Sequence, residues 1–316
     1  MTNPARIDVH QHILPPAYAN WLNEKGIESG GVPTPQWSAE DALKLMDENG
    51  IATGILSVSS PGVHLGNDAQ ARVKAREVNE FAAKVVSDHP HRFGFFATLT
   101  LPDVDGALAE AVYALDELHA AGVVLLANSH GRYLGEKDFD PLMQELNRRH
   151  AVVFVHPSEL PGPSVQGVPS FAADFLLDTT RAAINLIVSG TMTRYTNLKV
   201  ILSHAGGFIP YAAHRMAPVC SPDGNVETGL ENLRRFYFDT ALSSSPTALP
   251  SLLAFADPSH ILYGSDSPFA PVQAVSRFTD GLDTYPLDNQ LRSAINRMNA
   301  ETLFGQFANV LIPIQN

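Results

Sequence analysis

Short apolar segments alternate along the chain with longer segments whose apolar residues recur at helical spacing. The short segments are rich in β-branched and aromatic residues, which is typical of buried strands. They lie at 6–10, 52–58, 93–99, 123–127, 152–155, 199–203, 236–239 and 261–263. Helices are predicted at 105–121, 139–149, 174–194 and 246–256. Another helix is predicted to begin after Ser38, whose side chain can cap it ahead of Glu40 and Asp41, and to end at Asn49-Gly50.

Eight predicted strands separated by helices indicate an α/β protein with a (β/α)₈ TIM barrel. A doubly wound sheet is the competing fold, but it requires a glycine-rich turn after its first strand. Here the first strand is followed by Leu14-Pro15-Pro16. Residues 13–37, rich in proline and glycine, are predicted to form a long irregular loop inserted after strand 1, and 288–307 a helical C-terminal tail broken near Gly305. Because no composition shift marks a boundary, we predict a single domain over 1–316.

Composition and net charge argue against two classes of protein, those that bind nucleic acids and those that bind membranes. The chain has 316 residues, of which 45% are hydrophobic, and a net charge of −12. This acidic balance argues against a nucleic-acid or anionic-membrane surface, because both need basic patches. Neither a signal peptide nor a membrane-spanning segment is evident, and the single cysteine, Cys220, suits a reducing compartment. We therefore expect a cytoplasmic protein that does not bind membranes.

The first predicted strand ends in His10-Gln11-His12. Residues two apart in a strand point to the same face, so both imidazoles leave the backbone on one side, where they can bind a divalent metal. A lone His-x-His is weak evidence, because it is more often a polar strand end. Other predicted strands, however, end in His156, His204 and Asp266. In a barrel these strand ends surround one active site. Three imidazoles from this set, together with the carboxylate, suit a catalytic Zn²⁺ or a similar ion.

The other histidines carry weaker signals. His64 and His130 each follow a strand closely enough to line the same pocket, although a solvated loop position explains them equally well. Five more lie at predicted helix ends or turns and need no functional explanation; they are His89, His91, His119, His150 and His260. Cys220 is interpreted as a buried residue rather than a nucleophile.

The segments IDVHQH, VFVHP, ILSHAGGFIPYAAHR and ILYGSDSPF resemble the amidohydrolase superfamily, in the branch of metal-dependent non-oxidative decarboxylases. That branch includes aminocarboxymuconate-semialdehyde and γ-resorcylate decarboxylases. Further segments, such as RFGFFATLTLPD and FYFDTALSSSP, are most similar to 6-methylsalicylate decarboxylases, and the resemblance covers essentially the whole chain. It implies an amidohydrolase-type barrel that decarboxylates a salicylate-type (ortho-hydroxy aromatic) acid such as 6-methylsalicylate, releasing CO₂ and a phenol.

The resemblance also implies roles for individual residues. His10, His12, His156 and Asp266 would bind one divalent metal, Zn²⁺ in the first place or Mn²⁺, because the fourth strand lacks the lysine that bridges two metals in related hydrolases. His204 would be a catalytic imidazole, and either His204 or Asp266 would protonate the ring. Arg215 would bind the substrate, in some members from a neighbouring subunit. The alternative for Arg215 is a salt bridge on the helix surface or at an interface. Phe269 matches an aromatic residue that flanks the substrate in the family. Independently of the resemblance, the aromatic side chains of Trp37 and Phe269 can wall the substrate ring, or serve as apolar lid or core residues. Homodimers or homotetramers are common in the family.

The chain departs at three positions from the sequence patterns of related decarboxylases, and these departures restrict the class of substrate that we expect. His10 stands where γ-resorcylate decarboxylases tend to have an acid, and Gly207 stands where they have an acid three residues after the catalytic histidine. Ala42 replaces a second arginine of the aminocarboxymuconate type, so we expect a substrate with a single carboxylate.

Two rival functions remain open at this point. A metal-dependent hydrolase of a lactone or amide would use the same ligands, with water as nucleophile and His204 as base. A non-catalytic barrel would be expected to have lost at least one of these site residues, and all of them are present.

Overall fold

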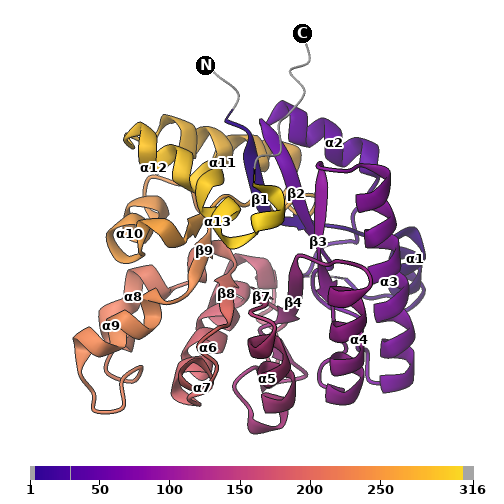
Figure 1. Cartoon of the computed structure of the whole chain (residues 1–316), viewed down its shortest axis with the longest axis horizontal. Coiled ribbons are helices and arrows are strands. Elements are labelled where there is room, and N and C mark those ends of the chain that lie inside the picture. The colour runs from indigo at the N-terminus through magenta and orange to yellow at the C-terminus, as the bar shows by residue number, and fades with distance from the viewer. Residues whose placement is uncertain (1–3, 29, 309–316) are drawn as a thin grey trace.

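The computed structural model describes residues 4–28 and 30–308. Eight parallel strands form one sheet in chain order, surrounded by helices (Figure 1). The strands are β1 (Arg6–His12), β2 (Ile51–Ser57), β3 (Phe93–Thr98), β4 (Gly122–Leu126), β7 (Val152–His156), β8 (Lys199–Leu202), β9 (Tyr237–Asp239) and β10 (Ile261–Leu262). The predicted barrel is confirmed, with strand bounds close to those predicted. An additional two-stranded hairpin, β5 (Asn128–Ser129) with β6 (Arg132–Tyr133), follows β4.

Hydrogen bonds between β1 and the segment after β10 close the barrel. The amide of Asp266 donates to the carbonyl of His10 at 2.7 Å, and the amide of His12 donates to the carbonyl of Ser267 at 2.7 Å. These bonds hold the first and last strand ends together. Residues more than 250 positions apart in the sequence, such as His12 and Asp266 with a separation of 254, therefore lie side by side.

The helices form the outer layer of the barrel (Figure 1). They are α2 (Ala39–Glu48), α3 (Asp68–Asp88), α4 (Val104–Asp116), α5 (Asp140–Arg148), α6 (Asp174–Val188), α7 (Thr191–Arg194), α8 (Ile209–Met216), α9 (Val226–Arg234), α10 (Ala248–Phe255) and α11 (Val272–Thr284). Ser38 caps α2 as predicted, because its hydroxyl accepts from the amide of Asp41 at 3.0 Å. The helix predicted over 174–194 is broken into α6 and α7 at Gly190, where φ is +76°.

The prediction of an irregular loop over 13–37 is wrong for its first part. Helix α1 (Pro16–Glu24) lies there, and it buries Tyr18, Trp21 and Leu22 against the core. These side chains recur at helical spacing, and proline at the first helical position is compatible with a helix start. Helix α3 is absent from the sequence-based prediction, because half of the residues in its buried stripe are alanines (Ala71, Ala75 and Ala82), which give a weak hydrophobic signal.

Two hydrophobic clusters hold the fold together. The larger cluster packs strands against helices, whereas the smaller one takes residues from the strands and from the C-terminal segment. That segment contains α12 (Asn289–Ser293), a π-helical turn at Ala294–Met298 and α13 (Asn299–Leu303), which agrees with the predicted helical tail. Phe304 and Phe307 follow it and join the smaller cluster, beside Phe96 of β3 and Phe154 of β7. In the described part of the chain, no helix is long and apolar enough to span a membrane.

Candidate active site

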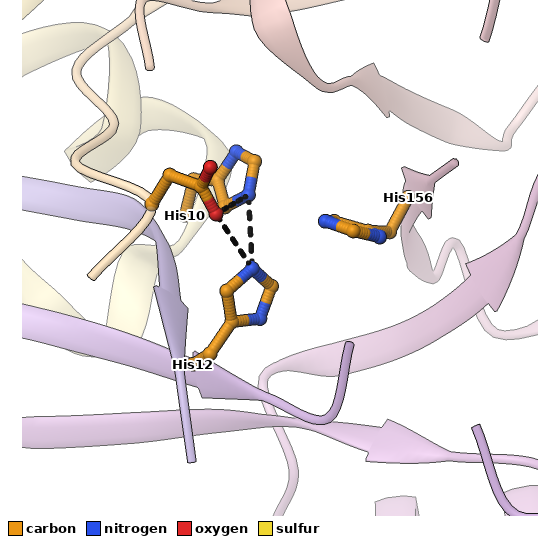
Figure 2. Close-up of side chains that lie close together, drawn as sticks. His10, His12 and His156 are labelled. Carbon is orange, nitrogen blue, oxygen red and sulfur yellow. Dashed lines mark hydrogen bonds and ion pairs between the residues drawn. The ribbon is translucent and has the colours of Figure 1, made fainter. Parts of the chain in front are cut away.

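Four of the predicted site residues form a buried cluster at the carboxyl ends of β1, β7 and β10. His10, His12, His156 and Asp266 each place one potential ligand atom within 4.8 Å of the others. Oδ1 of Asp266 lies 3.0 Å from Nε2 of His12 and 3.2 Å from Nε2 of His10. The two Nε2 atoms are themselves 3.1 Å apart. Figure 2 shows the ring of His156 facing the rings of His10 and His12 from the opposite side.

Each imidazole of the cluster is oriented by an oxygen on its outer side. The three Nδ1 atoms face acceptors, so that each Nδ1–H donates outward and Nε2 remains available toward the centre. The contacts are His10 to Oδ2 of Asp239 at 2.7 Å, His12 to the carbonyl of Ser57 at 3.1 Å, and His156 to the carbonyl of Pro157 at 2.8 Å. Metal-binding histidines are usually held in this way, by acceptors that set the ring tautomer.

The electrostatics of the cluster match the donors that a divalent ion requires. Burial lowers the pKa of His12 and of His156, and keeps both rings neutral. Burial also opposes the charged form of His10, but the carboxylates of Asp239 and Asp266 raise its pKa to about 10. Burial would raise the pKa of Asp266, but His10 and the surrounding hydrogen bonds hold it well below its ordinary value. The cluster thus offers neutral nitrogens and an ionised oxygen, together with one proton that a cation can displace. These donors fit a divalent transition metal.

Asp239 is a site residue that the sequence did not reveal. Its Oδ2 contacts His10, while its Oδ1 accepts from the amides of His204 at 2.9 Å and Ala241 at 3.0 Å. One fully buried carboxylate therefore orients the His10 ring and the backbone of His204. The sequence signal that could have revealed Asp239 is its position at the end of a predicted strand. His10, His156 and His204 occupy the corresponding positions at the ends of other strands.

His204 lies beside the cluster, with its Nε2 3.3 Å from Oδ2 of Asp266. Its Nδ1 is buried and has no hydrogen-bond partner within 4–28 and 30–308. A proton can pass between His204 and Asp266 at this separation. A small movement of either side chain would shorten the contact to the range of an ordinary hydrogen bond.

The turn that carries His204 has an unusual backbone. His204, Ala205, Gly206 and Gly207 all have positive φ, with values of 54°, 56°, 73° and 65°. A Cβ on Gly207 would lie 2.1 Å from the carbonyl oxygen of Leu176, which no side chain can accommodate without a shift of the backbone. Glycine at this position therefore follows from the close approach of α6. The same contact excludes the acid expected here in γ-resorcylate decarboxylases.

A cavity of about 690 Å³ opens onto the cluster. His156, His204 and Asp266 line its buried end, and its volume lies within the range of small-molecule sites. Its walls are largely apolar and include Phe171, Phe175, Leu176, Leu242, Phe269 and Phe278. The Phe269 ring packs edge-on against His12, with centroids 5.3 Å apart. Phe269 therefore lies in the cavity wall directly beside the cluster.

Two predicted substrate contacts do not line this cavity. Trp37 packs against Phe81 of α3, with ring centroids 6.2 Å apart, and is a partly buried residue at the edge of the helix–strand core. This position matches the alternative interpretation of Trp37 as a core residue. Arg215 lies exposed on α8, outside the cavity wall. Ala42, the residue that replaces a second arginine, is buried in α2.

His64 and His130 line a separate cavity of about 390 Å³ rather than the one above the cluster. Nδ1 of His64 lies 3.0 Å from Nε2 of His130, and Nε2 of His64 lies 2.8 Å from Oδ1 of Asp68. Cys220 is buried, and burial raises the pKa of its thiol to about 11. The thiol is therefore protonated at neutral pH, in agreement with its interpretation as a non-nucleophilic residue.

Comparison with known proteins assigns nearly the whole chain to a single protein family. The amidohydrolase family profile matches residues 7–306. A 6-methylsalicylic acid decarboxylase of Aspergillus aculeatus is 41% identical over 288 residues, covering 87% of each chain. A 6-methylsalicylic acid decarboxylase of Penicillium expansum is 38% identical over 318 residues, covering 97% of this chain and 98% of its own length.

Solved structures share the fold. The crystal structure of an amidohydrolase II superposes with a TM-score of 0.90 at 33% identity and covers 95% of this chain and 99% of its own. A dihydroxybenzoic acid decarboxylase of Polaromonas sp., crystallised with manganese and the inhibitor 2-nitroresorcinol, has a TM-score of 0.80 at 23% identity. That match covers 95% of this chain and 97% of the other.

Proposed function

This chain belongs to the amidohydrolase family, and on that premise we propose that it decarboxylates a salicylate-type acid such as 6-methylsalicylate, releasing CO₂ and a phenol. It is a carboxy-lyase, as are its relatives at 38% and 41% identity. The observation that carries the proposal is the buried cluster of His10, His12, His156 and Asp266 at the end of an aromatic-lined cavity. Ala42 stands where the aminocarboxymuconate type has a second arginine, which supports a substrate with a single carboxylate.

We propose that the cluster holds one divalent ion. Zn²⁺ suits three imidazole nitrogens and one carboxylate, and Mn²⁺ is the second candidate. The manganese bound by the Polaromonas decarboxylase supports the second candidate. Strand β4 carries no lysine, which supports a single ion rather than a pair. When bound, the ion supplies a Lewis acid and a template for the carboxylate and ortho-hydroxyl of the substrate.

The chain's own residues supply the proton and the shape of the site. Decarboxylation without an oxidant requires a proton on the ring carbon that bears the carboxylate. A C–H bond forms there, the C–C bond breaks, and its electron pair returns to the ring as CO₂ leaves. The His204–Asp266 pair holds this proton, since their facing atoms are 3.3 Å apart beside the cavity. Phe269 positions the aromatic ring, and the apolar walls exclude water from the reacting carbon.

We further propose a cytoplasmic homodimer or homotetramer in which Arg215 contributes to substrate binding. The exposed α8 region supports an interface there, because Tyr211 is 87% exposed and Val219 is 62% exposed on either side of Arg215. Exposed large apolar side chains grouped around one element are typical of association surfaces. The single buried Cys220 suits a reducing compartment.

The function is tested by incubating the metal-loaded protein with 6-methylsalicylate and measuring CO₂ and m-cresol. Equal molar amounts of both products are expected, and treatment with a chelator should stop the reaction until Zn²⁺ or Mn²⁺ is added back. The same preparation is assayed with lactone and amide substrates. Hydrolysis of those compounds, with no CO₂ from any ortho-hydroxy aromatic acid, would overturn the proposal in favour of a hydrolase.

A further inference from the structure

Among residues 4–28 and 30–308, one permanently cationic side chain lines the cavity above the cluster. It is Arg277 of α11, and no other arginine or lysine of these residues belongs to the lining. It is exposed, whereas His156, His204 and Asp266 of the same cavity are buried. Arg277 therefore lies at the rim, and the reactive groups lie at the inner end.

The N–H donors of the Arg277 guanidinium are available to bind a ligand. Within the described part of the chain the guanidinium makes no ion pair or hydrogen bond, whereas other arginines pair with carboxylates, such as Arg72 with Asp103 and Arg149 with Asp116. Its contact is with the ring of Phe278, whose centroid lies 5.1 Å from Cζ of Arg277. An aromatic face attracts a guanidinium and leaves its N–H donors free to bind an anion.

The negative net charge of the whole protein is the reason that a cation at the rim affects the binding of an anion. An aromatic acid is an anion at neutral pH, and the chain carries a net charge of −12, so the overall field repels it. A single cation in an apolar rim offsets that repulsion locally and raises the rate at which an anion enters. We propose, on the basis of the function proposed above, that Arg277 captures the carboxylate of the incoming aromatic acid at the rim of the cavity. The phenol product has lost the carboxylate, so Arg277 favours entry of the substrate without retaining the product.

Three variants test this role. Arg277→Gln removes the charge, Arg277→Lys keeps the charge without the planar fork, and Arg148→Gln is the matched control. Arg148 is an exposed arginine at the end of α5 that does not line the cavity, so its substitution changes net charge equally. For Arg277→Gln we expect a fall in kcat/KM of about threefold to tenfold, mainly in KM, with a flatter salt dependence. Arg277→Lys should retain most of the salt dependence, and Arg148→Gln should match the wild type.

Calorimetric binding of salicylate and of neutral m-cresol separates this role from the function itself. We expect Arg277→Gln to weaken salicylate binding and leave m-cresol binding unchanged. Equal salicylate binding by Arg277→Gln and wild type would overturn the role of Arg277 while leaving the decarboxylase intact. Salicylate binding that depends on Arg277, in a protein that releases no CO₂, would overturn the proposed function and support the anion capture. Equal weakening of both ligands would indicate a general structural effect and contradict the proposal.

Discussion

Nδ1 of His10 lies 2.7 Å from Oδ2 of Asp239, and both side chains are fully buried. The contact fixes the ring of a proposed metal ligand, and through its second oxygen Asp239 also holds the backbone of His204. A single carboxylate thus couples the two halves of the site, the cluster and the adjacent imidazole.

We predict that Asp239→Asn weakens metal binding by about tenfold to a hundredfold, because an amide holds and polarises the His10 ring less strongly than a carboxylate. Competition with a chromophoric chelator measures the affinity, and circular dichroism checks the fold. Asp88→Asn, at an exposed end of α3, is the matched control and should bind metal as the wild type does. Unchanged affinity in Asp239→Asn would contradict the orienting role.

Metal binding should release about one proton and weaken as the pH falls. The proton comes from His10, whose pKa is raised to about 10 by Asp239 and Asp266 and which is therefore protonated at neutral pH. His12 and His156 have lowered pKa values and contribute no proton in this range. Below pH 10 the affinity should fall by about tenfold per pH unit for each proton displaced. Calorimetry in buffers of different ionisation enthalpy counts the protons, and a count of zero would exclude His10 as the source.

His204→Asn and Asp266→Asn should both strongly reduce decarboxylation but differ in metal content. His204→Asn removes a proton carrier, for which the expected loss is about a hundredfold or more, and it should retain the metal. Asp266→Asn also removes a proposed ligand and should lose metal as well. His64→Asn, in the separate cavity, is the control and should retain both metal and activity. Near-normal turnover in His204→Asn would exclude it from proton transfer.

Gly207→Ala should destabilise the fold by about 3 kcal/mol, from strain at positive φ together with a steric clash. The added Cβ would lie 2.1 Å from the carbonyl oxygen of Leu176. Gly224→Ala is the matched control, since Gly224 has a φ of +75° but no atom within 4 Å of an added Cβ. It should cost about 1 kcal/mol, from backbone strain alone. Urea unfolding measures both values, and equal losses would show that the approach of Leu176 does not matter.

The strands were predictable because each is a short apolar segment bounded by breakers, and this signal is local. The ends of β1, β7 and β10 were predictable for the same reason, since histidine and aspartate are conspicuous after apolar residues. Helix α1 was missed because proline and glycine obscured a short amphipathic pattern. Asp239 was missed because an aspartate at a strand end is common, and its importance depends on a partner 229 residues away.

The sequence by itself determined the order of the strands, the chemistry at their ends and the resemblance to decarboxylases, because all three are properties of local residue patterns. Only the tertiary structure decided which nitrogen of each imidazole faces the cluster, because that depends on acceptors such as Asp239 from other strands. It also decided that Phe269 and Arg277 line the cavity while Trp37 and Arg215 do not. Side-chain direction at a barrel mouth depends on how distant segments pack, and neither periodicity nor spacing contains that information.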